Sequence, residues 1–353
     1  MKFMDFVALA GRRKSYAGDY GIEIETECER VYEPPVMNYW KADADGSLRN
    51  YGIEYSLRKP VNYNLVGDAL EEFKTSLASR LFLSSAYTSV HIHMNISRMT
   101  LSETASLYTA YCLFEEVLNK YCGPTRDGNL FCLKNSIADR SVNTFKSIYK
   151  SLDKDPSEGV NSLFDLNESG LKYAACNVYT LAKFQSLEIR THAGTTNIVE
   201  IQRWIDILEH MKIFALQFKP NEIIKYFHQE KNKTVIMNAV FGDLSDYLIT
   251  DSLDRDLTVG LFYALQVAKS VTDWKTLDAR CVKYSTKEPV EPTNRPEVVS
   301  RWHQVNTMSR EDSSRAARQM YNTATGSRPI PTGTASPPAQ PRDIFSSLEE
   351  EDF

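Results

Sequence analysis

The chain has 353 residues, of which 42% are hydrophobic and 25% are charged, and its formal net charge at pH 7 is −5. These values are typical of a globular protein that can bury a large core. The negative net charge argues against a surface that coats nucleic acid, so no nucleic-acid partner is expected.

The N-terminus and the cysteines indicate the compartment. No stretch approaches the roughly 20 apolar residues of a membrane-spanning helix, and the first residues lack the basic and apolar regions of a signal peptide. The six cysteines are scattered and contain no Cys-x-x-Cys pair, which favours reduced thiols over a disulfide framework. A bridge between Cys122 and Cys132 is the alternative. We therefore expect a cytoplasmic protein with no membrane partner.

The stretch Gly-Ile-Glu-Ile-Glu-Thr-Glu at residues 21–27 has the alternation of a β-strand. Its three carboxylates, on Glu23, Glu25 and Glu27, leave the sheet on one face. Neighbouring carboxylates repel one another unless water, a cation or another partner lies between them. Taken alone, this strand fits either a solvated outer face or a metal site.

The next segment is predicted to be a β-hairpin. Residues 39–43 form a strand, and a turn at Asp45 and Gly46 connects it to a second strand at 52–56. In this second strand Glu54 alternates with two apolar residues, so its carboxylate leaves the sheet on the face away from them.

Two later strands repeat this design. The strand Ser-Val-His-Ile-His-Met-Asn-Ile puts His91 and His93 on one face, and the strand Ser-Leu-Glu-Ile-Arg does the same for Glu188 and Arg190. Two histidines in one short strand are unusual in a chain that has six. Hard divalent cations bind carboxylate oxygens, imidazole can complete a coordination shell, and a guanidinium suits phosphate. The four strands together predict a polar face that binds metal ions and phosphate.

Helical periodicity predicts three helices with apolar stripes, of which the last is expected to pack on the apolar face of these strands. The first covers residues 65–83, with an apolar stripe that extends to Leu81. The second begins at a capping box formed by Thr100 and Glu103. The third covers residues 197–218.

The order Glu-x-Glu, Gly-x-Glu, His-x-His and Glu-x-Arg resembles that of the amidoligases, which are carboxylate–amine ligases related to glutamine synthetase and γ-glutamylcysteine synthetase. The small amidoligases of phages and bacteria are the closer match. Supporting motifs are Asp-Gly-Ser-Leu at 45–48 and Leu-Glu-Ile-Arg-Thr-His-Ala-Gly-Thr at 187–195. The chain has Leu57 where these enzymes often carry proline, and Ser186 where they often carry threonine. Neither departure touches an expected ligand, so both concern the substrate.

The resemblance implies an α+β fold with a glutamine-synthetase-like curved antiparallel sheet. The site would lie on the concave face and the helices on the convex side. The implied ligands of two or more Mg²⁺ or Mn²⁺ ions are Glu23, Glu25, Glu54, His91 and Glu188. His93 and Arg190 would contact the phosphates of ATP. The implied substrate contacts are Asp45, Ser47 and Lys172.

The implied function is ATP-dependent joining of a carboxylate to an amine through an acyl phosphate, on a small molecule or a protein side chain. A phage-encoded enzyme would act in the host cytoplasm. Two other classes remain open. One is a metal-dependent hydrolase, because a His-x-His strand also serves zinc sites. The other is an inactive amidoligase-like protein with a structural or interaction role in a phage.

We expect a catalytic domain over residues 1–219, a helical appendix over 220–284 that packs on it, and a linker with a marginal helix over 285–321. Residues 322–353 are rich in Thr, Ser, Gly and Pro before an acidic end, and are expected to be disordered. The end, at 344–353, resembles the Phe-terminated acidic tips by which some single-strand-binding proteins dock protein partners. A tail that only increases solubility is the alternative.

Overall fold

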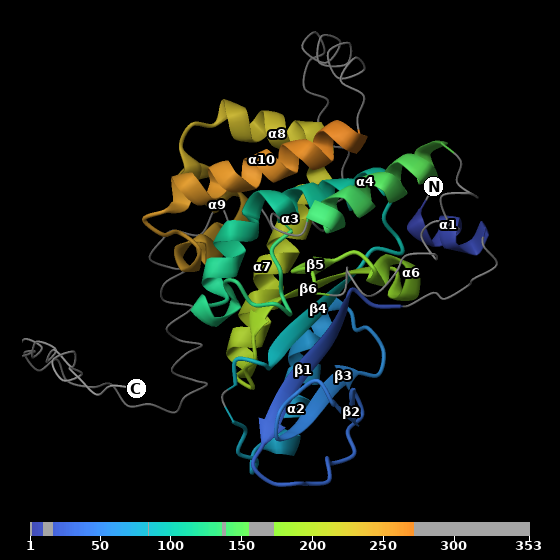
Figure 1. Cartoon of the computed structure of the whole chain (residues 1–353), viewed down its shortest axis with the longest axis vertical. Helices are drawn as coiled ribbons and strands as arrows, with labels where there is room; N and C mark the ends of the chain where they lie inside the picture. The colour runs from blue at the N-terminus through green and yellow to red at the C-terminus, as the bar shows by residue number, and fades with distance from the viewer. Residues whose placement is uncertain (1, 10–16, 84, 136–138, 155–172, 272–353) are drawn as a thin grey trace, which may run out of the picture. The chain divides into compact units, whose positions relative to one another are not determined.

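Figure 1 shows the chain as a computed structural model. The structure describes residues 2–9, 17–83, 85–135, 139–154 and 173–271. They belong to a compact unit that covers Met1–Ser285. The expected linker and tail lie outside the described residues.

Six strands form one open antiparallel sheet in the order β2-β3-β1-β4-β6-β5 (Figure 1). The strands are β1 Tyr20–Cys28, β2 Trp40–Ala44, β3 Tyr51–Leu57, β4 Ser89–Asn95, β5 Cys176–Asn177 and β6 Ser186–Ala193. The sequence predicted all of them except β5, which has two residues. The expectation of a mixed fold with an antiparallel sheet is confirmed.

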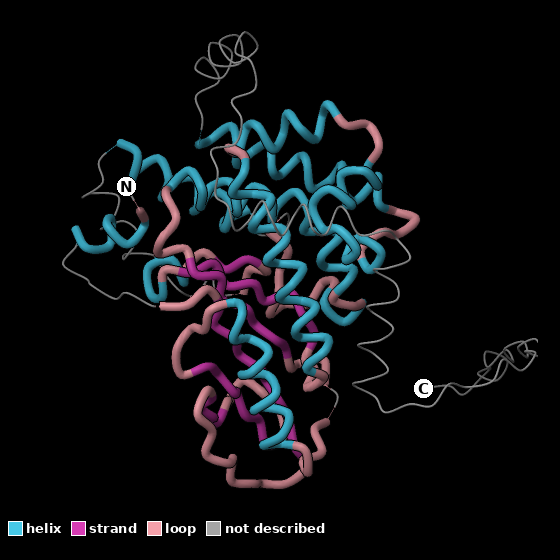
Figure 2. Tube along the Cα trace, turned by 180° about the vertical axis from the view of Figure 1, so that it is seen from behind, coloured by secondary structure: helices cyan, strands magenta, loops and turns pink. Residues whose placement is uncertain are grey.

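The helices are α1 Phe3–Leu9, α2 Val66–Leu77, α3 Leu101–Tyr121, α4 Asp139–Lys154, α6 Thr180–Phe184, α7 Ile198–Gln217, α8 Pro220–Gln229, α9 Lys233–Phe241 and α10 Leu253–Val271. Figures 1 and 2 show α2 and α7 lying across one face of the sheet. None of the described helices combines the length and the apolar character that crossing a bilayer requires.

The apolar face of the sheet is buried against α2. Trp40 of β2 and Tyr55 of β3 are both inaccessible to solvent, and both rings contact Phe73 of α2 with centroids 5.3 Å apart. The Trp40 indole also donates a hydrogen bond to the carbonyl of Ala69 at 2.7 Å. Burying aromatic side chains of this size stabilises a fold by about 1.5–3 kcal/mol each. This packing leaves the opposite face of the sheet for polar side chains.

Helix α3 begins where the sequence predicted. Thr100 accepts a hydrogen bond from the amide of Glu103 at 3.2 Å, and the Glu103 carboxylate accepts one from the amide of Thr100 at 2.7 Å. These two bonds satisfy amide groups that a helix N-terminus otherwise leaves unpaired.

The prediction for the first helix is wrong at its C-terminal end. Helix α2 stops at Leu77, and Leu81, which was expected on the apolar stripe, is 91% exposed. The chain leaves the helix because the amide of Leu83 bonds the carbonyl of Glu27 in β1 at 2.8 Å. A local periodicity does not detect such a competing long-range contact.

The segment after residue 219 packs on α3. Helices α8 and α10 both contact α3, and Figure 1 shows the three together. A Cβ atom on Gly260 of α10 would lie 1.9 Å from the carbonyl oxygen of Leu113 in α3, so only glycine permits this close approach. The ammonium of Lys120 lies 2.6 Å from the carboxylate of Asp256 and adds an ion pair to the contact.

The strand register determines which side chains face each other. Strand β1 lies between β3 and β4, and β4 pairs on its other side with β6. The facing pairs are Glu25 with Glu54, Glu23 with His91, and His93 with Glu188. Three independent strand contacts therefore bring the predicted ligands onto one face of the sheet.

One irregularity interrupts the pairing of β4 with β6. A single residue of β4, His91, lies opposite two residues of β6, Arg190 and Thr191. Such a β-bulge bends a strand and redirects its side chains. Arg190 points to the same face as Glu188, whereas the hydroxyl of Thr191 bonds that of Tyr111 in α3 at 3.1 Å, on the helix side.

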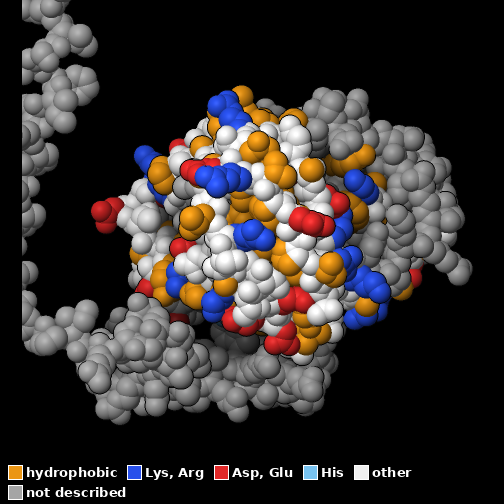
Figure 3. Space-filling model, turned by 90° about the horizontal axis from the view of Figure 1, so that it is seen from below, with side chains coloured by type: hydrophobic (Ala, Val, Ile, Leu, Met, Phe, Trp, Pro, Cys, Tyr) orange, Lys and Arg blue, Asp and Glu red, His pale blue; other side chains and the backbone are white. Residues whose placement is uncertain are grey.

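The outer surface carries charges of both signs. Figure 3 shows basic, acidic and hydrophobic side chains interspersed on the face seen there. Neither sign of charge dominates that face.

Candidate functional site

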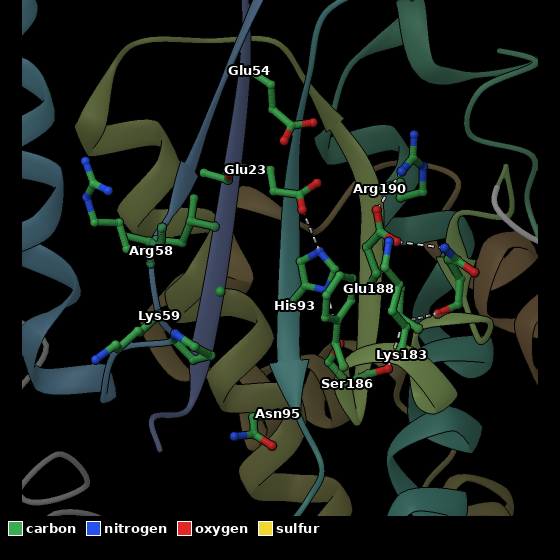
Figure 4. A pocket seen from close by; sticks show the side chains of 18 of the residues that line it. Glu23, Glu54, Arg58, Lys59, His93, Asn95, Lys183, Ser186, Glu188 and Arg190 are labelled. Atoms are coloured by element: carbon green, nitrogen blue, oxygen red, sulfur yellow. Dashed lines mark hydrogen bonds and ion pairs between the residues drawn. The ribbon is translucent and has the colours of Figure 1, made fainter. Parts of the chain in front are cut away.

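The polar face of the sheet opens into a cavity of about 580 Å³. Its lining includes side chains from all six strands and from α6. Figure 4 shows Glu54, Glu23 and Arg190 toward one end of this cavity and Lys59 and Lys183 toward the other. The carboxylates of Glu23 and Glu54 therefore lie toward one end together with Arg190, and lysine side chains lie toward the other.

Glu23, His93 and Glu188 form a first group of ligand atoms, which all lie within 4.8 Å of one another. His93 Nε2 is 3.1 Å from Glu23 Oε1, and its Nδ1 is 3.0 Å from the hydroxyl of Ser186. The ring of Phe184 meets the imidazole edge-on, with centroids 5.5 Å apart. A partner on Nδ1 orients an imidazole so that Nε2 can bind a metal.

Glu25, Asp45 and Glu54 form a second group, whose ligand atoms also lie within 4.8 Å of one another. The Glu25 carboxylate is buried and accepts a hydrogen bond from the hydroxyl of Ser89 at 2.6 Å. Asp45 comes from the β2–β3 turn, where it accepts bonds from the amide and hydroxyl of Ser47 at 2.8 and 2.7 Å. Ser47 thus holds Asp45 in place.

His91 lies between the two groups, with only 2% of its side chain exposed. Its Nδ1 is 3.1 Å from Glu23 Oε2 and 3.6 Å from Glu188 Oε1. Its Nε2 is 2.6 Å from the hydroxyl of Ser89 and 3.7 Å from Glu25 Oε1. The imidazole therefore links the carboxylates of one group to those of the other.

Arg190 borders the first group. Its Nη1 donates to Glu188 Oε1 at 2.5 Å, and its Nε donates to the carbonyl of Phe131 at 3.4 Å. The side chain is 17% exposed and lines the cavity. A guanidinium in this position can present its remaining N–H groups to an anion that enters the cavity.

Four further basic side chains line the cavity. Lys41 pairs with Asp43 at 3.0 Å. Arg58, Lys59 and Lys183 form no ion pair with any other residue that the structure describes, although the Lys183 ammonium lies 4.8 Å from the centroid of a phenylalanine ring. Lys59 and Lys183, away from Glu54 in Figure 4, thus provide positive charge that can bind an anion at the basic end of the cavity.

The carboxylates differ in protonation because their surroundings differ. Burial raises the pKa of Glu54 to about 7, and the negative charges of Glu23, Glu25 and Asp45 act in the same direction, against His91. A carboxylic acid that keeps its proton near neutral pH relieves the repulsion among these groups. A divalent cation would relieve it by displacing that proton.

Nearby positive charge has the opposite effect in the first group. Burial opposes ionisation of Glu23, but His93 and His91 outweigh it and hold the pKa of Glu23 well below its usual value. Burial also opposes ionisation of Glu188, and Arg190 makes the largest contribution to lowering its pKa. Glu23 in turn raises the pKa of His93 against the effect of burial. Two carboxylates in this group are therefore negatively charged at neutral pH.

The raised pKa of Glu54 predicts how stability depends on pH. Between the ordinary pKa of 4.5 and about 7, the folded chain keeps a proton on Glu54 that the unfolded chain has lost. Stability of the metal-free protein should therefore fall as pH rises through this window. The measurement is urea denaturation at pH 5, 6, 7 and 8 with a chelator present. Glu54→Gln, which cannot titrate, should flatten this part of the profile, and an unchanged profile in the variant would contradict the assignment.

The structure brings most of the sequence-predicted residues together. Those that gather on the polar face are Glu23, Glu25, Glu54, His91, His93, Glu188 and Arg190. Asp45 joins the second group, Ser47 supports it, and Lys172 lies outside the described residues.

Sequence reasoning missed several residues of the site. Ser89 and Ser186 stand two positions before His91 and Glu188, so the same alternation could have found them. Asn177 donates to Glu188 at 2.7 Å from the short strand β5, which has no sequence signal of its own.

Comparison with models of known protein families finds no match, and no curated protein matches the chain.

Proposed function

We propose that the chain is an ATP-dependent carboxylate–amine ligase that forms an amide or isopeptide bond, with a glutamine-synthetase-like sheet and an amidoligase site. The observation that carries this proposal is the pair of carboxylate-rich groups joined by His91, with Arg190 beside them at one cavity. Five carboxylates and an imidazole are a donor set for Mg²⁺ or Mn²⁺. The pKa of Glu54, which burial raises most and the neighbouring carboxylates raise further, also indicates negative charge that cations would neutralise.

Each group of ligands would hold one divalent ion. Glu25, Asp45 and Glu54 offer only oxygen, which suits Mg²⁺. Glu23, His93 and Glu188 include a nitrogen, which favours Mn²⁺. The geometry supports roles for the two histidines that differ from the expected ones, in which His91 was a metal ligand and His93 contacted phosphate. His93 serves as a ligand, and the more deeply buried His91 holds both groups in register.

The reaction joins two substrates with loss of water. A carboxylate oxygen attacks the γ-phosphorus of ATP, the bond to the β,γ-bridging oxygen breaks, and ADP leaves. The amine nitrogen then attacks the acyl carbon, a proton leaves the nitrogen, and phosphate departs. Bound divalent ions would neutralise and orient the phosphates. Arg190, held by Glu188 and Phe131, would donate to the oxygens of the transferring phosphoryl group.

The basic end of the cavity would bind the carboxylate substrate. Changing Lys59 and Lys183 together to Gln should raise the KM for that substrate roughly tenfold or more, because two charge-assisted contacts are lost. The measurement is ADP formation at varied carboxylate concentration. Lys41→Gln is the matched control, because that ammonium lines the same cavity but is paired with Asp43. An equal rise of KM in both variants would contradict this role.

The direct test uses purified protein with ATP, Mg²⁺ or Mn²⁺, and pooled amines and carboxylic acids, including a host-cell lysate. We expect metal-dependent formation of ADP, together with a product whose mass is that of two components less one water. A metal-dependent hydrolase would release products without ADP. Absence of ATP binding in calorimetry with metal present would refute the ligase proposal.

A further inference from the structure

A buried arginine that the proposed mechanism does not use lies behind the site. Arg126 belongs to the short turn Pro124–Arg126 after α3, and it is only 1% exposed. Its Nε donates to the carbonyl of Thr191 at 3.1 Å, and its Nη2 donates to the carbonyl of Arg190 at 2.7 Å. These are the two bulge residues of β6 that lie opposite His91.

The placement of this cation is unusual. Both of its hydrogen bonds to oxygen run to backbone carbonyls, its other partner is the Cys132 thiol, and it forms no ion pair with a carboxylate among the described residues. Burying a charge is costly unless its hydrogen bonds compensate. The two charge-assisted bonds hold the carbonyls of Arg190 and Thr191 in place. They do so at the bulge, where the hydrogen bonds between β4 and β6 constrain the backbone least.

The same loop holds Arg190 at further points. The carbonyl of Phe131 accepts from the Arg190 guanidinium at 3.4 Å. The amide of Arg190 donates to the carbonyl of Ala175 at 2.8 Å, and the amide of Ala175 donates to the carbonyl of Leu133 at 2.7 Å. Residues 126–133 thus constrain the backbone and the side chain of Arg190 at once.

We propose that Arg126 is a positioning residue for Arg190. It holds the β6 bulge in the one conformation that aims the Arg190 guanidinium across Glu188 into the cavity. The expected effect of Arg126 on the reaction rate rests on the proposed function. Its expected effect on the conformation of the bulge does not. A displacement of about 1 Å at a reacting group can lower a rate by roughly a hundredfold.

The first experiment measures the bulge itself. Arg126→Met removes every donor while keeping an unbranched side chain of similar reach. Hydrogen exchange followed by mass spectrometry should show faster exchange in the peptide that contains residues 188–193. Lys134→Met is the control, because the Lys134 ammonium pairs with Asp127 of the same loop and with Glu116 of α3, and forms no ion pair with β6. Unchanged exchange at 188–193 in a folded Arg126→Met would overturn the proposal, whatever the reaction is.

The second experiment measures whether Arg126 acts through Arg190. Aluminium fluoride bound with Mg²⁺ and ADP mimics a transferring phosphoryl group. The measured quantity is the ratio of the affinity for ADP with Mg²⁺ and aluminium fluoride to the affinity for ADP with Mg²⁺ alone. Arg126→Met should reduce this ratio roughly 10- to 100-fold in the wild type but leave it unchanged in an Arg190→Lys background. Arg126→Lys should recover part of the loss. A general loss of stability would reduce the ratio similarly in both backgrounds, and that outcome would overturn the proposal. If the wild type binds no nucleotide, the ligase proposal fails while the hydrogen-exchange result still decides this one.

Discussion

Turnover of Arg190→Lys is expected to fall by roughly two to five orders of magnitude, whereas nucleotide affinity should fall much less. The substitution keeps the positive charge but removes the planar fork that can donate two parallel hydrogen bonds to phosphate. In the structure one arm of that fork already pairs with Glu188, and Nε is held by the Phe131 carbonyl. A lysine ammonium cannot meet both of these acceptors and an incoming phosphoryl group in the same geometry.

This variant separates two roles of Arg190. A residue that only neutralises Glu188 would tolerate lysine, because the ion pair survives. The measurement is ADP formation with amine and carboxylate present, beside nucleotide binding by calorimetry. Arg203→Lys is the control, since the Arg203 guanidinium lies over the Tyr247 ring and does not line the cavity. Near-wild-type turnover of Arg190→Lys would refute the phosphoryl contact.

Sequence reasoning located the site because alternation in a strand is a local property. Two-residue periodicity alone places Glu23 with Glu25, and His91 with His93, on one side of their strands. It cannot determine which strands are neighbours. The pairing of His93 with Glu188 joins residues 95 positions apart, and the register that joins them depends on the packing of the whole sheet.

Features that depend on long-range contacts were not predictable. The β6 bulge has no glycine or other local signal, and it is supported by Arg126, which is 64 residues away from Arg190. The end of α2 depends on a hydrogen bond between Leu83 and Glu27. In each case a contact with a distant residue outweighs the secondary structure that the local sequence favours. The local sequence therefore predicts neither the bulge nor the end of the helix.

The three glutamates of β1 show both the strength and the limit of the pattern. All three alternate with Ile22, Ile24 and Thr26, yet they do not share one environment. Glu27 accepts hydrogen bonds from the amide of Arg49 at 2.8 Å and from the Asn50 side chain at 3.1 Å. Its carboxylate is therefore satisfied by the β2–β3 turn, whereas Glu23 and Glu25 lie in the two candidate metal groups.

This difference gives the metal prediction a matched control within one strand. Mg²⁺ or Mn²⁺ should stabilise the wild type, because ions that bind the folded state shift the unfolding equilibrium by mass action. At a metal concentration about a hundredfold above Kd the gain is about 2.7 kcal/mol for one site. Glu23→Gln and Glu25→Gln should each lose the contribution of one group, since an amide oxygen is a far weaker ligand than a carboxylate. Glu27→Gln should respond to metal as the wild type does.

Without metal, Glu25→Gln should not destabilise the fold. Glu25→Gln removes one negative charge from a group in which repulsion already raises the pKa of Glu54, so its metal-free form should be as stable as the wild type or slightly more stable. Its Ser89 contact can persist, because an amide oxygen also accepts a hydrogen bond. Thermal unfolding with a chelator and at graded concentrations of Mg²⁺ and Mn²⁺ measures both effects. If Glu25→Gln and Glu27→Gln respond alike, or if the wild type ignores both ions, the carboxylates of β1 do not bind metal and the two candidate groups serve another purpose.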